Sequence, residues 1–563
     1  MDPLTQNHWK RWMDYSDLDS DLKQELHSLH GEELESAFYR YLDFGTAGMR
    51  GLIGPGTNRM NRYTVRRTTE GLARYLESGT NREQERGVVI AFDSRLKSPQ
   101  FAEEAAAVLA THGIRVHLFP SLRPTPFLSF AVRHLEAAAG IMITASHNPA
   151  AYNGYKMYGE DGAQMPSHKM EAILRNIEAI QDELTIPVLS PEEGRAQGWI
   201  ETLGETVDQA YMEHLLRLSL RGKREANQAL QVVFTPLHGT GNLPVRHVLE
   251  KLGYTGLYIV PEQEHPDPAF STVATPNPEE PAAFARALEY ARKREADLVL
   301  ATDPDADRLG IRVKSRSGDY LPFNGNQIGA LLLYYLLTER KQQGTLPSNG
   351  VIVQSLVTSD LGRSIAHSFG VAVDEVLTGF KYIAEKIAEY ESDRRYQFLF
   401  GYEESGGYLL DGFVRDKDAI QAAMLICEAA AHYKERGLTL DEVLHRLYEE
   451  HGWYRETLAS FTFSGKAGQE RMTAIMDRLR HRPPKRIGGL AVRKQKDYIQ
   501  GLDGFPPTQM LKYILEDGSW IAVRPSGTEP KIKLYLNTVG PSETTAQNKL
   551  NRIQKDMHDW LEA

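Results

Sequence analysis

The chain has 563 residues, of which 41% are hydrophobic and 25% are charged, and its formal net charge at pH 7 is −10. This length exceeds what one hydrophobic core supports, so we expect a soluble globular protein of about three to five domains. The acidic balance excludes the basic surface typical of nucleic-acid-binding proteins, so affinity for an anionic ligand must come from local clusters of Arg and Lys.

The sequence predicts a cytoplasmic protein with neither a membrane nor a nucleic-acid partner. Its N-terminus lacks the basic and apolar regions of a signal peptide, and the longest aliphatic run, around residues 328–337, is too short to span a bilayer. The single cysteine, Cys427, lies in an apolar helical stretch, which predicts a buried small hydrophobe and permits no disulfide within the chain. The oligomeric state is not predicted.

Residues up to about Arg40 have helical periodicity and are expected to form an N-terminal arm. A glycine-rich segment follows at 44–51, in which small residues would let the backbone approach a ligand that Arg50 can reach. The alternative is a plain turn with a surface arginine.

The next segment predicts a βαβ unit. An apolar strand at 88–92 is followed by a helix with Ser98 as N-cap and Pro99 in its first turn, and this helix ends near Gly113. A second apolar strand follows at 116–119. This alternation implies a parallel sheet.

The following apolar strand ends in a loop that contains Ser146, His147 and Pro149. Open α/β sheets place their chemistry at this end of a strand. A serine hydroxyl needs a base, a metal or a cluster of donors to react, and His147 is one candidate base. Residues 153–156 read as a tight turn that would bring the Lys156 ammonium back toward the loop, as a partner for an anionic group on the serine. The alternative is a polar loop with a capping serine.

A second α/β unit contains a strand at 230–234 and a helix at 243–252, and its last apolar strand, at 296–301, ends in an acidic loop. Asp303, Asp305 and Asp307 alternate there, which in extended backbone places three carboxylates on one face. The repulsion of about 2 kcal/mol per pair at an effective dielectric near 20 predicts a cation among them.

Hard oxygen ligands in that loop favour Mg²⁺ or Ca²⁺. The glycine and distal glutamate of an EF-hand are missing, and three carboxylates with open positions suit Mg²⁺. The alternative is a solvated acidic loop compensated by Arg308.

A third unit begins with a helix from Gly325 and includes a strand at 351–354, a helix that opens at Ser359 and a strand at 396–400. The loop after this last strand, 401–407, contains Glu403, Glu404 and Ser405 in a glycine-rich frame. Carboxylates suit hydrogen bonds to neighbouring sugar hydroxyls, although a solvated acidic turn is the alternative. The pattern then loosens between residues 452 and 495, which predicts a hinge or linker before a smaller α+β domain.

Near the C-terminus, the segment from Arg524 to Pro530 offers hydroxyls, backbone amides and a guanidinium in one turn, with Lys531 and Lys533 behind it. This predicts an anion cradle, with a plain hairpin turn as the alternative. Together with the three loops above, it leads to a structural hypothesis. If the three α/β units are copies of one another, their loops could face one shared cleft.

The loops at Thr144–Pro149, Asp303–Arg308, Gly401–Gly407 and Arg524–Thr528, in this order, resemble the phosphoserine, metal, sugar and phosphate loops of the α-D-phosphohexomutase family, which contains phosphoglucomutases and phosphomannomutases. The resemblance covers nearly the whole chain. It implies three topologically related α/β domains with mixed sheets and a smaller, mobile C-terminal α+β domain around a central cleft. The expected boundaries are 1–204 for the phosphoserine-loop domain with its helical arm, 205–320 for the metal-loop domain, 321–450 for the sugar-loop domain and 451–563 for the phosphate-binding domain.

The resemblance also implies an intramolecular phosphotransferase that interconverts α-D-glucose 1-phosphate and glucose 6-phosphate. Glucose 1,6-bisphosphate would be the intermediate and activator, and Mg²⁺ the cofactor. Ser146 would carry the phosphoryl group and hold Mg²⁺ together with Asp303, Asp305 and Asp307.

Lys156 is the first candidate for the general base, ahead of His147 and Arg308, although a lysine needs a lowered pKa for this role. Closure of the last domain over the sugar is expected to exclude water. The residues expected to bind the sugar phosphate are Arg50, Thr378, Gly379, Glu403, Ser405, Lys417, Arg524, Ser526, Gly527 and Thr528.

Residues 377–381 occupy the place of the loop that distinguishes sugars in this family, and they look most like the phosphoglucomutase and phosphopentomutase-like branch. Gly407 departs from the histidine that several relatives carry. A second departure is the short phosphate loop, which leaves open whether Lys533 plays the part that an arginine has in relatives. Both features leave the preference among glucose, mannose and pentose phosphates open.

Two other functional classes remain as alternatives. A phosphatase would share the cation loop and the phosphate cradle but would release inorganic phosphate. A catalytically silent sugar-phosphate-binding protein would have no chemical need for the serine, the three aspartates and the phosphate loop together.

Overall fold

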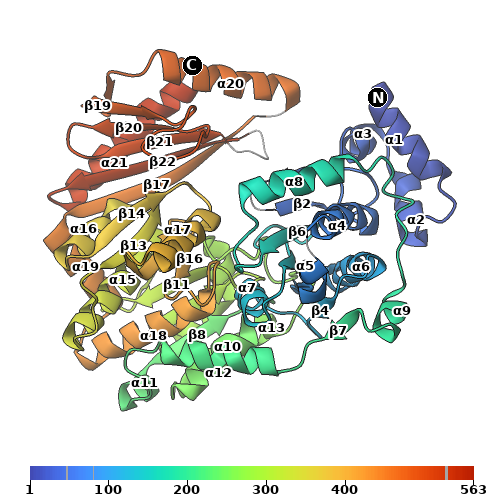
Figure 1. The fold of residues 1–563 in the computed structure, drawn as a ribbon. Helices are drawn as coiled ribbons and strands as arrows, with labels where there is room; N and C mark the ends of the chain where they lie inside the picture. Colours follow the sequence, from blue (N-terminus) through green and yellow to red (C-terminus); the bar gives the residue numbers. More distant parts are fainter. Residues whose placement is uncertain (46–47, 80, 464, 526–530, 563) are drawn as a thin grey trace.

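The computed structural model describes residues 1–45, 48–79, 81–463, 465–525 and 531–562. These residues form four sheets, and each sheet comes from one continuous part of the chain (Figure 1). The first unit lies at the right of the view, the fourth at the upper left, and the second and third below and between them. The predicted fold class, three related α/β units and a smaller C-terminal α+β unit, is confirmed.

The N-terminal arm is helical, as predicted, and is not free of the rest of the chain. Trp12 and Phe38 of the arm share a buried core with Tyr63 and Leu184 of the first unit. The helices of the arm are α1 (Pro3–Asp14), α2 (Ser20–Ser28) and α3 (Gly31–Phe38).

The first unit contains a seven-stranded mixed sheet in the order β1-β2-β6-β5-β3-β4-β7. Strands β5, β3, β4 and β7 pair in parallel, as the βαβ pattern predicts, whereas β5-β6, β6-β2 and β2-β1 are antiparallel. Helices cover both faces, and the alternate residues of β3 enter two different cores. The elements are β1 (Phe44–Gly45), β2 (Gly48–Leu52), α4 (Arg62–Glu77), α5 (Asn81–Arg86), β3 (Val88–Phe92), α6 (Ser98–Thr111), β4 (Val116–Leu118), α7 (Thr125–His134), β5 (Ala139–Ile143), β6 (Tyr152–Gly159), α8 (Ser167–Glu178), α9 (Pro191–Ala196) and β7 (Ile200–Thr202).

The second unit has a five-stranded sheet in the order β12-β11-β10-β8-β9, and the third has a four-stranded sheet in the order β14-β13-β15-β16. The second unit consists of α10 (Thr206–Arg217), α11 (Glu225–Ala229), β8 (Gln231–Thr235), α12 (Asn242–Lys251), β9 (Gly256–Ile259), α13 (Pro261–Glu264), η1 (Pro281–Phe284), α14 (Ala285–Arg294), β10 (Leu298–Thr302), β11 (Leu309–Lys314) and β12 (Tyr320–Phe323). The third consists of α15 (Gly325–Gln342), β13 (Gly350–Ser355), α16 (Asp360–Ser368), β14 (Ala372–Val376), α17 (Phe380–Asp393), β15 (Gln397–Glu403), β16 (Gly407–Leu409), α18 (Ala419–Glu435) and α19 (Leu440–His451).

The three α/β units hold their polar loops in the same way. The serine loop joins β5 to β6, the aspartate loop joins β10 to β11, and the sugar loop joins β15 to β16. The strand before each loop pairs in parallel with a neighbouring strand of its sheet, β5 with β3, β10 with β8 and β15 with β13. The strand after each loop pairs antiparallel with the strand before the loop. Each loop therefore leaves the carboxyl end of a parallel pair, which is where α/β sheets bind ligands.

The fourth unit is a six-stranded antiparallel sheet in the order β17-β22-β21-β20-β19-β18, with two helices packed on it in one core. The expected hinge or linker at residues 452–495 is wrong, because this part of the chain holds β17, α20, β18 and β19. Strand β17 lies at the edge of the sheet and is half-exposed, so its sequence lacks an apolar run. The elements are β17 (Trp453–Thr462), α20 (Gly465–His481), β18 (Arg486–Ile487), β19 (Leu490–Asp497), β20 (Leu511–Leu515), β21 (Trp520–Pro525), β22 (Lys531–Gly540) and α21 (Glu543–Glu562).

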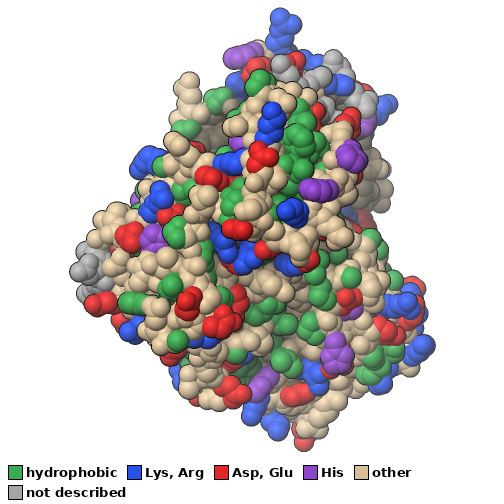
Figure 2. Space-filling view, turned by 90° about the vertical axis from the view of Figure 1, so that its right-hand side faces the viewer, with side chains coloured by type: hydrophobic (Ala, Val, Ile, Leu, Met, Phe, Trp, Pro, Cys, Tyr) green, Lys and Arg blue, Asp and Glu red, His purple; other side chains and the backbone are tan. Residues whose placement is uncertain are grey.

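The cysteine, the apolar helices and the surface charges were each predicted from composition. Cys427 is buried in α18, as predicted for a small hydrophobe. Within the described part of the chain, no helix is long and apolar enough to cross a membrane. On the face drawn in Figure 2, basic and acidic side chains are interspersed rather than gathered by sign.

Candidate active site

Ser146 lies in the loop after β5 and is buried. Its Oγ donates a hydrogen bond to Asp303 Oδ2 at 2.6 Å and lies 3.2 Å from His147 Nδ1. Its backbone N–H donates to Thr144 Oγ1 at 2.8 Å, and its φ of 51° is in the left-handed region. The serine loop of the first unit and the aspartate loop of the second therefore meet at the serine hydroxyl.

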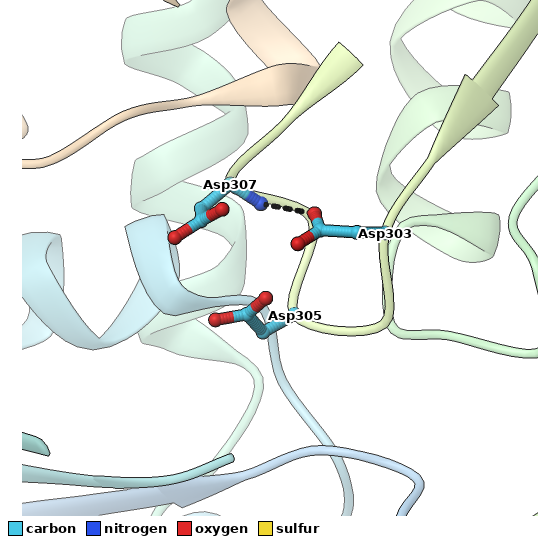
Figure 3. A group of neighbouring side chains, drawn as sticks. All are labelled: Asp303, Asp305 and Asp307. Atoms are coloured by element: carbon cyan, nitrogen blue, oxygen red, sulfur yellow. Dashed lines mark hydrogen bonds between the residues drawn. The ribbon is translucent and has the colours of Figure 1, made fainter. Parts of the chain in front are cut away.

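The aspartate loop is a turn and not the extended segment that the alternating sequence predicts. Ala306 has a φ of 49°, and its N–H donates to the Asp303 carbonyl at 2.9 Å. Asp303 Oδ1 accepts the N–H groups of Asp307 at 3.1 Å and Arg308 at 3.0 Å. The chain thus curls around the Asp303 carboxylate, and the three carboxylates converge from the two sides of the turn (Figure 3).

These three aspartates fit a divalent cation. Each offers a carboxylate oxygen, all three of which lie within 4.8 Å of one another, and all three residues are buried. Asp305 Oδ1 and Asp307 Oδ1 are buried without a hydrogen-bond partner among the described residues. A buried carboxylate oxygen with no donor is costly, so a hard cation such as Mg²⁺ would satisfy both atoms.

Burial and the neighbouring Asp307 and Asp305 raise the pKa of Asp303 well above its usual range. Burial acts in the same direction on Asp307, but Lys417, Lys156 and Arg308 outweigh it and lower the pKa of this carboxyl. The three cations therefore compensate the charge of the aspartate loop.

Lys156 and Lys417 reach the aspartates from two different units. Lys156 Nζ lies 2.8 Å from Asp305 Oδ2 and 3.4 Å from Asp307 Oδ2, and Lys417 Nζ lies 3.0 Å from Asp307 Oδ2. Burial lowers the pKa of Lys156, but Asp305 and Asp307 outweigh burial, and the net shift is upward. A raised pKa is the opposite of what a lysine general base requires.

The tight turn expected at residues 153–156 is wrong, because these residues belong to β6. Gly154 is needed there for a different reason, since a Cβ on it would lie 2.5 Å from the Thr144 carbonyl oxygen and 2.7 Å from that of Met49. The chain turns earlier, and Lys156 reaches the site because it lies on the strand that returns beside β5. A glycine at a close backbone approach looks like a turn glycine in a sequence.

Arg308 links the aspartate loop to the sugar loop. Its Nη1 donates to the Ser405 carbonyl at 3.2 Å and pairs with Glu279. Burial lowers the pKa of this guanidinium, but Glu279, Asp307 and Asp303 outweigh burial and raise it.

The sugar loop and the loop at 377–381 are in direct contact. Glu403 Oε1 accepts the N–H of Gly379 at 2.8 Å, and Thr378 Oγ1 is buried without a hydrogen-bond partner among the described residues. Gly407 is required by the stem of Lys417, because a Cβ there would lie 2.2 Å from Lys417 Cδ. A glycine at this position thus leaves room for the lysine that reaches the aspartates.

Two further expected residues lie at the serine loop. Arg50 comes from β2, and its Nη1 donates to Asn148 Oδ1 at 3.3 Å. Burial and the nearby Arg308 and Arg50 lower the pKa of His147 well below its ordinary value, which favours the neutral ring.

The fourth unit contributes Arg524 from β21, which pairs across the sheet with Lys533 of β22. Burial and the Arg524 charge lower the pKa of Lys533, while Glu404 raises it, so this lysine lies within electrostatic range of the sugar loop. Ser526, Gly527 and Thr528 lie outside the described residues.

Sequence reasoning missed two partners of the site. Thr125, the first residue of α7, donates its hydroxyl to Asp305 Oδ2 at 2.8 Å and its N–H to the Asp305 carbonyl at 2.9 Å. Glu279 pairs with Arg308. Both come from proline-rich segments between regular elements, and the only available signal was a polar residue next to a proline.

Four family models match the chain in order. They are described as phosphoglucomutase/phosphomannomutase alpha/beta/alpha domains I, II and III, at residues 42–184, 209–317 and 324–451, and the C-terminal domain at residues 476–554. Together they cover well over half of the chain.

Curated and solved proteins show the same likeness. A phosphoglucomutase of Staphylococcus aureus (strain bovine RF122 / ET3-1) is 41% identical over 546 residues, which span 95% of this chain and 96% of the relative. The solved putative phosphomannomutase of Thermus thermophilus is 25% identical with a TM-score of 0.68, over 93% of this chain and 99% of that one. The open form of the Paramecium phosphoglucomutase pp63/parafusin has a TM-score of 0.70 at 18% identity, over 92% and 94% of the two chains, which shows the fold.

Proposed function

This chain belongs to the phosphoglucomutase/phosphomannomutase family, and we propose that Ser146 is the residue through which it interconverts α-D-glucose 1-phosphate and glucose 6-phosphate. The enzyme is an intramolecular phosphotransferase that uses Mg²⁺ and glucose 1,6-bisphosphate. The observation that carries the serine assignment is the 2.6 Å hydrogen bond from Ser146 Oγ to Asp303.

In the proposed cycle, Ser146 carries a phosphoryl group and passes it to the free hydroxyl of a bound sugar monophosphate. The bisphosphate formed turns over in the cleft and returns its other phosphoryl group to the serine. In phosphoryl transfer the protein mainly positions the reactants and stabilises the negative charge on the oxygens of the transferred group. Both demands are met where the serine and aspartate loops meet.

Asp303, Asp305 and Asp307 are the residues that would hold Mg²⁺, together with an oxygen of the group on Ser146. When bound, Mg²⁺ supplies a hard positive charge beside the phosphoryl oxygens. A phosphoserine adds a charge of roughly −1.5 to −2, so the phosphoryl group and the cation would enter the site as a nearly neutral pair.

Lys156, Lys417 and Arg308 are assigned to charge stabilisation. All three are within 4.0 Å of an aspartate carboxylate, and each comes from a different unit of the fold. A protonated lysine can stabilise phosphoryl oxygens, and the ion pairs of Lys156 with Asp305 and Asp307 support that role for it. His147 Nδ1, 3.2 Å from Ser146 Oγ, is the proposed group that exchanges a proton with the serine.

We assign sugar recognition to the third and fourth units. Glu403 and Ser405 offer acceptors for sugar hydroxyls. Gly379 contacts Glu403 through its N–H, and the neighbouring Thr378 hydroxyl is buried without a hydrogen-bond partner among the described residues. Arg524, with residues 526–528 of the fourth unit, is assigned to the phosphate that is not being transferred. Arg50 lies at the serine loop and is assigned to the phosphoryl group in transfer. One phosphate-binding place used in both halves of the cycle would let the bisphosphate bind in either orientation.

We further propose four domains with the boundaries 1–204, 205–320, 321–450 and 451–563. The first and third divisions fall between sheets, whereas the second falls at the start of β12 (Tyr320–Phe323), which belongs to the second sheet. A cytoplasmic location is also part of the proposal, because the single cysteine is free and buried.

The proposal is tested by assaying the purified enzyme with glucose 1-phosphate, mannose 1-phosphate and ribose 1-phosphate, each with and without Mg²⁺. Isomerisation of glucose 1-phosphate at the highest kcat/KM, with phosphate on the peptide that contains Ser146, is expected. Release of inorganic phosphate without isomerisation would indicate a phosphatase instead. Phosphate on another residue would overturn the serine assignment.

A further inference from the structure

Arg95 lies behind the serine loop, three residues past the end of β3, and is almost fully buried. Its Nη1 donates to the carbonyl oxygens of Pro149 at 2.9 Å and Tyr152 at 3.0 Å. Its Nη2 donates to the carbonyl oxygens of Ser146 and Asn148. One guanidinium thus holds four carbonyls of one loop, which its rigid fork of donors allows and a lysine ammonium does not.

The serine loop needs such a support. A φ of 51° is uncommon for a serine, because the left-handed region crowds its Cβ. The N–H of Ser146 is tied to Thr144 Oγ1, and its carbonyl is tied to Arg95. Without the hydrogen bond from Arg95, the backbone of Ser146 could rotate toward the extended region, which would move the hydroxyl away from Asp303.

Arg95 is itself fixed from behind. Its Nε lies 3.4 Å from Asp93 Oδ2, and the same oxygen accepts the Thr144 hydroxyl at 2.7 Å. Asp93 Oδ1 accepts the Ser98 hydroxyl at 2.7 Å, and Ser98 Oγ accepts Asn153 Nδ2 at 2.9 Å. The chain before the loop and the chain after it are therefore joined through one buried polar network, which we call the Arg95 clamp.

The Arg95 clamp also touches the second unit. The guanidinium carbon of Arg95 lies 4.9 Å from the centre of the Phe270 ring, which is buried. Two residues further along, Thr272 Oγ1 is 2.8 Å from His238 Nε2. The cation–π contact thus connects the first unit to the loop of the second unit that contains His238.

That loop of the second unit supports the aspartate loop. Thr240 donates both its N–H, at 2.8 Å, and its hydroxyl, at 2.9 Å, to the carbonyl of Pro304. Gly239 packs so closely that a Cβ on it would lie 2.5 Å from Pro304 Cα. Pro304 stands between Asp303 and Asp305 in the sequence. The contacts that run from Ser146 through Arg95 and Phe270 to the aspartate loop therefore form a closed ring, because the Asp303 carboxylate contacts Ser146 again.

We propose that Arg95 is a positioning residue for phosphoryl transfer, which holds Ser146 in its left-handed conformation and, through Phe270, sets the serine loop in register with the aspartate loop. The assignment deepens the proposed function and rests on Ser146 as the phosphorylated residue. Because Arg95 is buried behind the loop, it acts through the position of Ser146 and not by contact with the sugar. A displacement of about 1 Å at a reacting group can cost about 100-fold in rate.

The test compares Arg95→Met and Arg95→Lys with the wild type. Each enzyme is phosphorylated with glucose 1,6-bisphosphate, and two rates are measured: transfer of the phosphoryl group to glucose 1-phosphate, and its loss to water in buffer. We expect transfer and kcat to fall about 100-fold in Arg95→Met, with KM and the loss to water changed less than about threefold. Arg95→Lys should recover only part of the loss, because one ammonium cannot hold four carbonyls.

Arg86→Met is the matched control. Arg86 also binds carbonyls of the first unit, those of Glu136 at 2.6 Å and Ala137 at 3.1 Å, but within the described part of the chain its hydrogen bonds reach no residue of the serine loop. This variant should keep the wild-type transfer rate. If it loses transfer as Arg95→Met does, the effect is a general loss of support in the first unit and the proposal is wrong.

A folded Arg95→Met that transfers within threefold of the wild type would overturn the proposal, as would a rise in KM that accounts for the whole loss of kcat/KM. If Arg95→Met does not fold, Phe270→Leu decides, because it removes the ring face and keeps an apolar side chain. It should lower transfer about 10-fold with KM unchanged, and an unaltered transfer rate would reject the proposal. A wild type that takes no phosphate on Ser146 rejects the proposed function itself.

Discussion

Ser146 combines a strained backbone with the hydroxyl that we propose carries the phosphoryl group. Its φ of 51° is unfavourable for any residue with a Cβ, and such strain persists only where neighbouring contacts enforce it. The hydrogen bond to Asp303 and the ties to Thr144 and Arg95 are those contacts. The position is therefore one at which activity and stability should respond differently to substitution.

We expect Ser146→Gly to be more stable than Ser146→Ala by about 1 kcal/mol, the reverse of the usual order for an ordered residue. Both variants lose the hydroxyl and should have no mutase turnover, but only glycine relieves the left-handed strain. Urea unfolding monitored in the first unit gives the order of the midpoints. An alanine variant that is the more stable of the two, or that retains turnover, would contradict this account.

His112 offers a pH-dependent contact far from the chemistry. It lies at the end of α6, where its Nε2 is 2.8 Å from Glu70 Oε2 and its Nδ1 is 2.8 Å from Glu77 Oε1 of α4. The hydrogen bond to Glu70 is the largest cause of a pKa raised from 6.5 to about 9. A raised pKa stabilises the fold below pH 6.5, and this stabilisation is lost as the pH rises through about 9.

His112→Gln should therefore destabilise the protein by about 1–2 kcal/mol at pH 6, a value reduced for the partial exposure of the ring. Near pH 10 the wild type and the variant should unfold together, because the wild-type ring is then neutral. Thermal unfolding at both pH values measures the difference. A gap that is the same at pH 6 and pH 10 would show that packing, and not charge, is what the substitution removes.

At the scale of the residue, the sequence could identify reactive groups but not their supports. Ser146, Asp303, Asp305 and Asp307 stand out because each follows an apolar strand and carries a chemical group that needs a partner. Arg95 follows an apolar strand too, but a single arginine after a strand is common and predicts nothing. Its importance comes from four carbonyls that lie more than fifty residues away and become neighbours only in the folded chain.

At the scale of the element, the sequence predicts the central strands well and the edge strands poorly. Strands β3, β5 and β10 are buried along their whole length and appear as unbroken apolar runs. Strand β17 is half-exposed at a sheet edge, and β6 contains a glycine required by a contact with another strand. The residue patterns of these two strands depend on contacts with distant parts of the chain, which the local sequence does not reveal.

The contact between the third and fourth units belongs to this scale. Trp520 of β21 donates its Nε1–H to Asp360 Oδ2 at 2.8 Å, at the start of α16. Lys512 of β20 stacks 4.1 Å from the Trp520 ring and donates to the Leu356 carbonyl at 2.7 Å. Leu377, the first residue of the loop expected to distinguish sugars, lies in the same buried core as Trp520.

Trp520→Phe should loosen the fourth unit without unfolding it. The variant keeps most of the apolar area but leaves Asp360 without its indole donor, at a cost of about 1–2 kcal/mol. Because the fourth unit contains Arg524, which we propose to bind the sugar phosphate, we expect KM for glucose 1-phosphate to rise several-fold with a smaller change in kcat. Steady-state kinetics measures both constants, and a fall in kcat at constant KM would place the effect in the chemical step instead.

At the scale of the whole molecule, three units of the fold meet at the aspartate loop. The second unit supplies the carboxylates, the first supplies Ser146 and Lys156, and the third supplies Lys417. The repeated position of each loop at the carboxyl end of a parallel pair brings these segments together, as the hypothesis of related units predicts. The sequence indicated which loops should converge but could not give the conformation of the aspartate turn, which depends on Ala306 in the left-handed region.

Binding of Mg²⁺ at this junction should stabilise the whole molecule. A cation bound only by the folded state raises the free energy of unfolding by RT ln(1 + [L]/Kd), which is about 2.7 kcal/mol at a concentration of 100 Kd. The three carboxylates belong to the second unit and Ser146 belongs to the first, so a cation held by both would couple these two units. We therefore expect a rise of several degrees in the thermal midpoint and a steeper transition.

Asp305→Asn is the matched variant for this prediction, because the amide fills the same space but offers one weaker ligand oxygen. It also removes the shorter of the two ion pairs of Lys156 and leaves the pair with Asp307. Mg²⁺ should raise its midpoint by less than half of the wild-type shift, and Mg²⁺-dependent turnover should be lost. Differential scanning calorimetry across a Mg²⁺ series, with EDTA as the reference, measures the shift without any substrate. Equal shifts in the wild type and the variant would remove Asp305 from the cation site, and equal Mg²⁺ dependence of turnover would remove it from the chemistry.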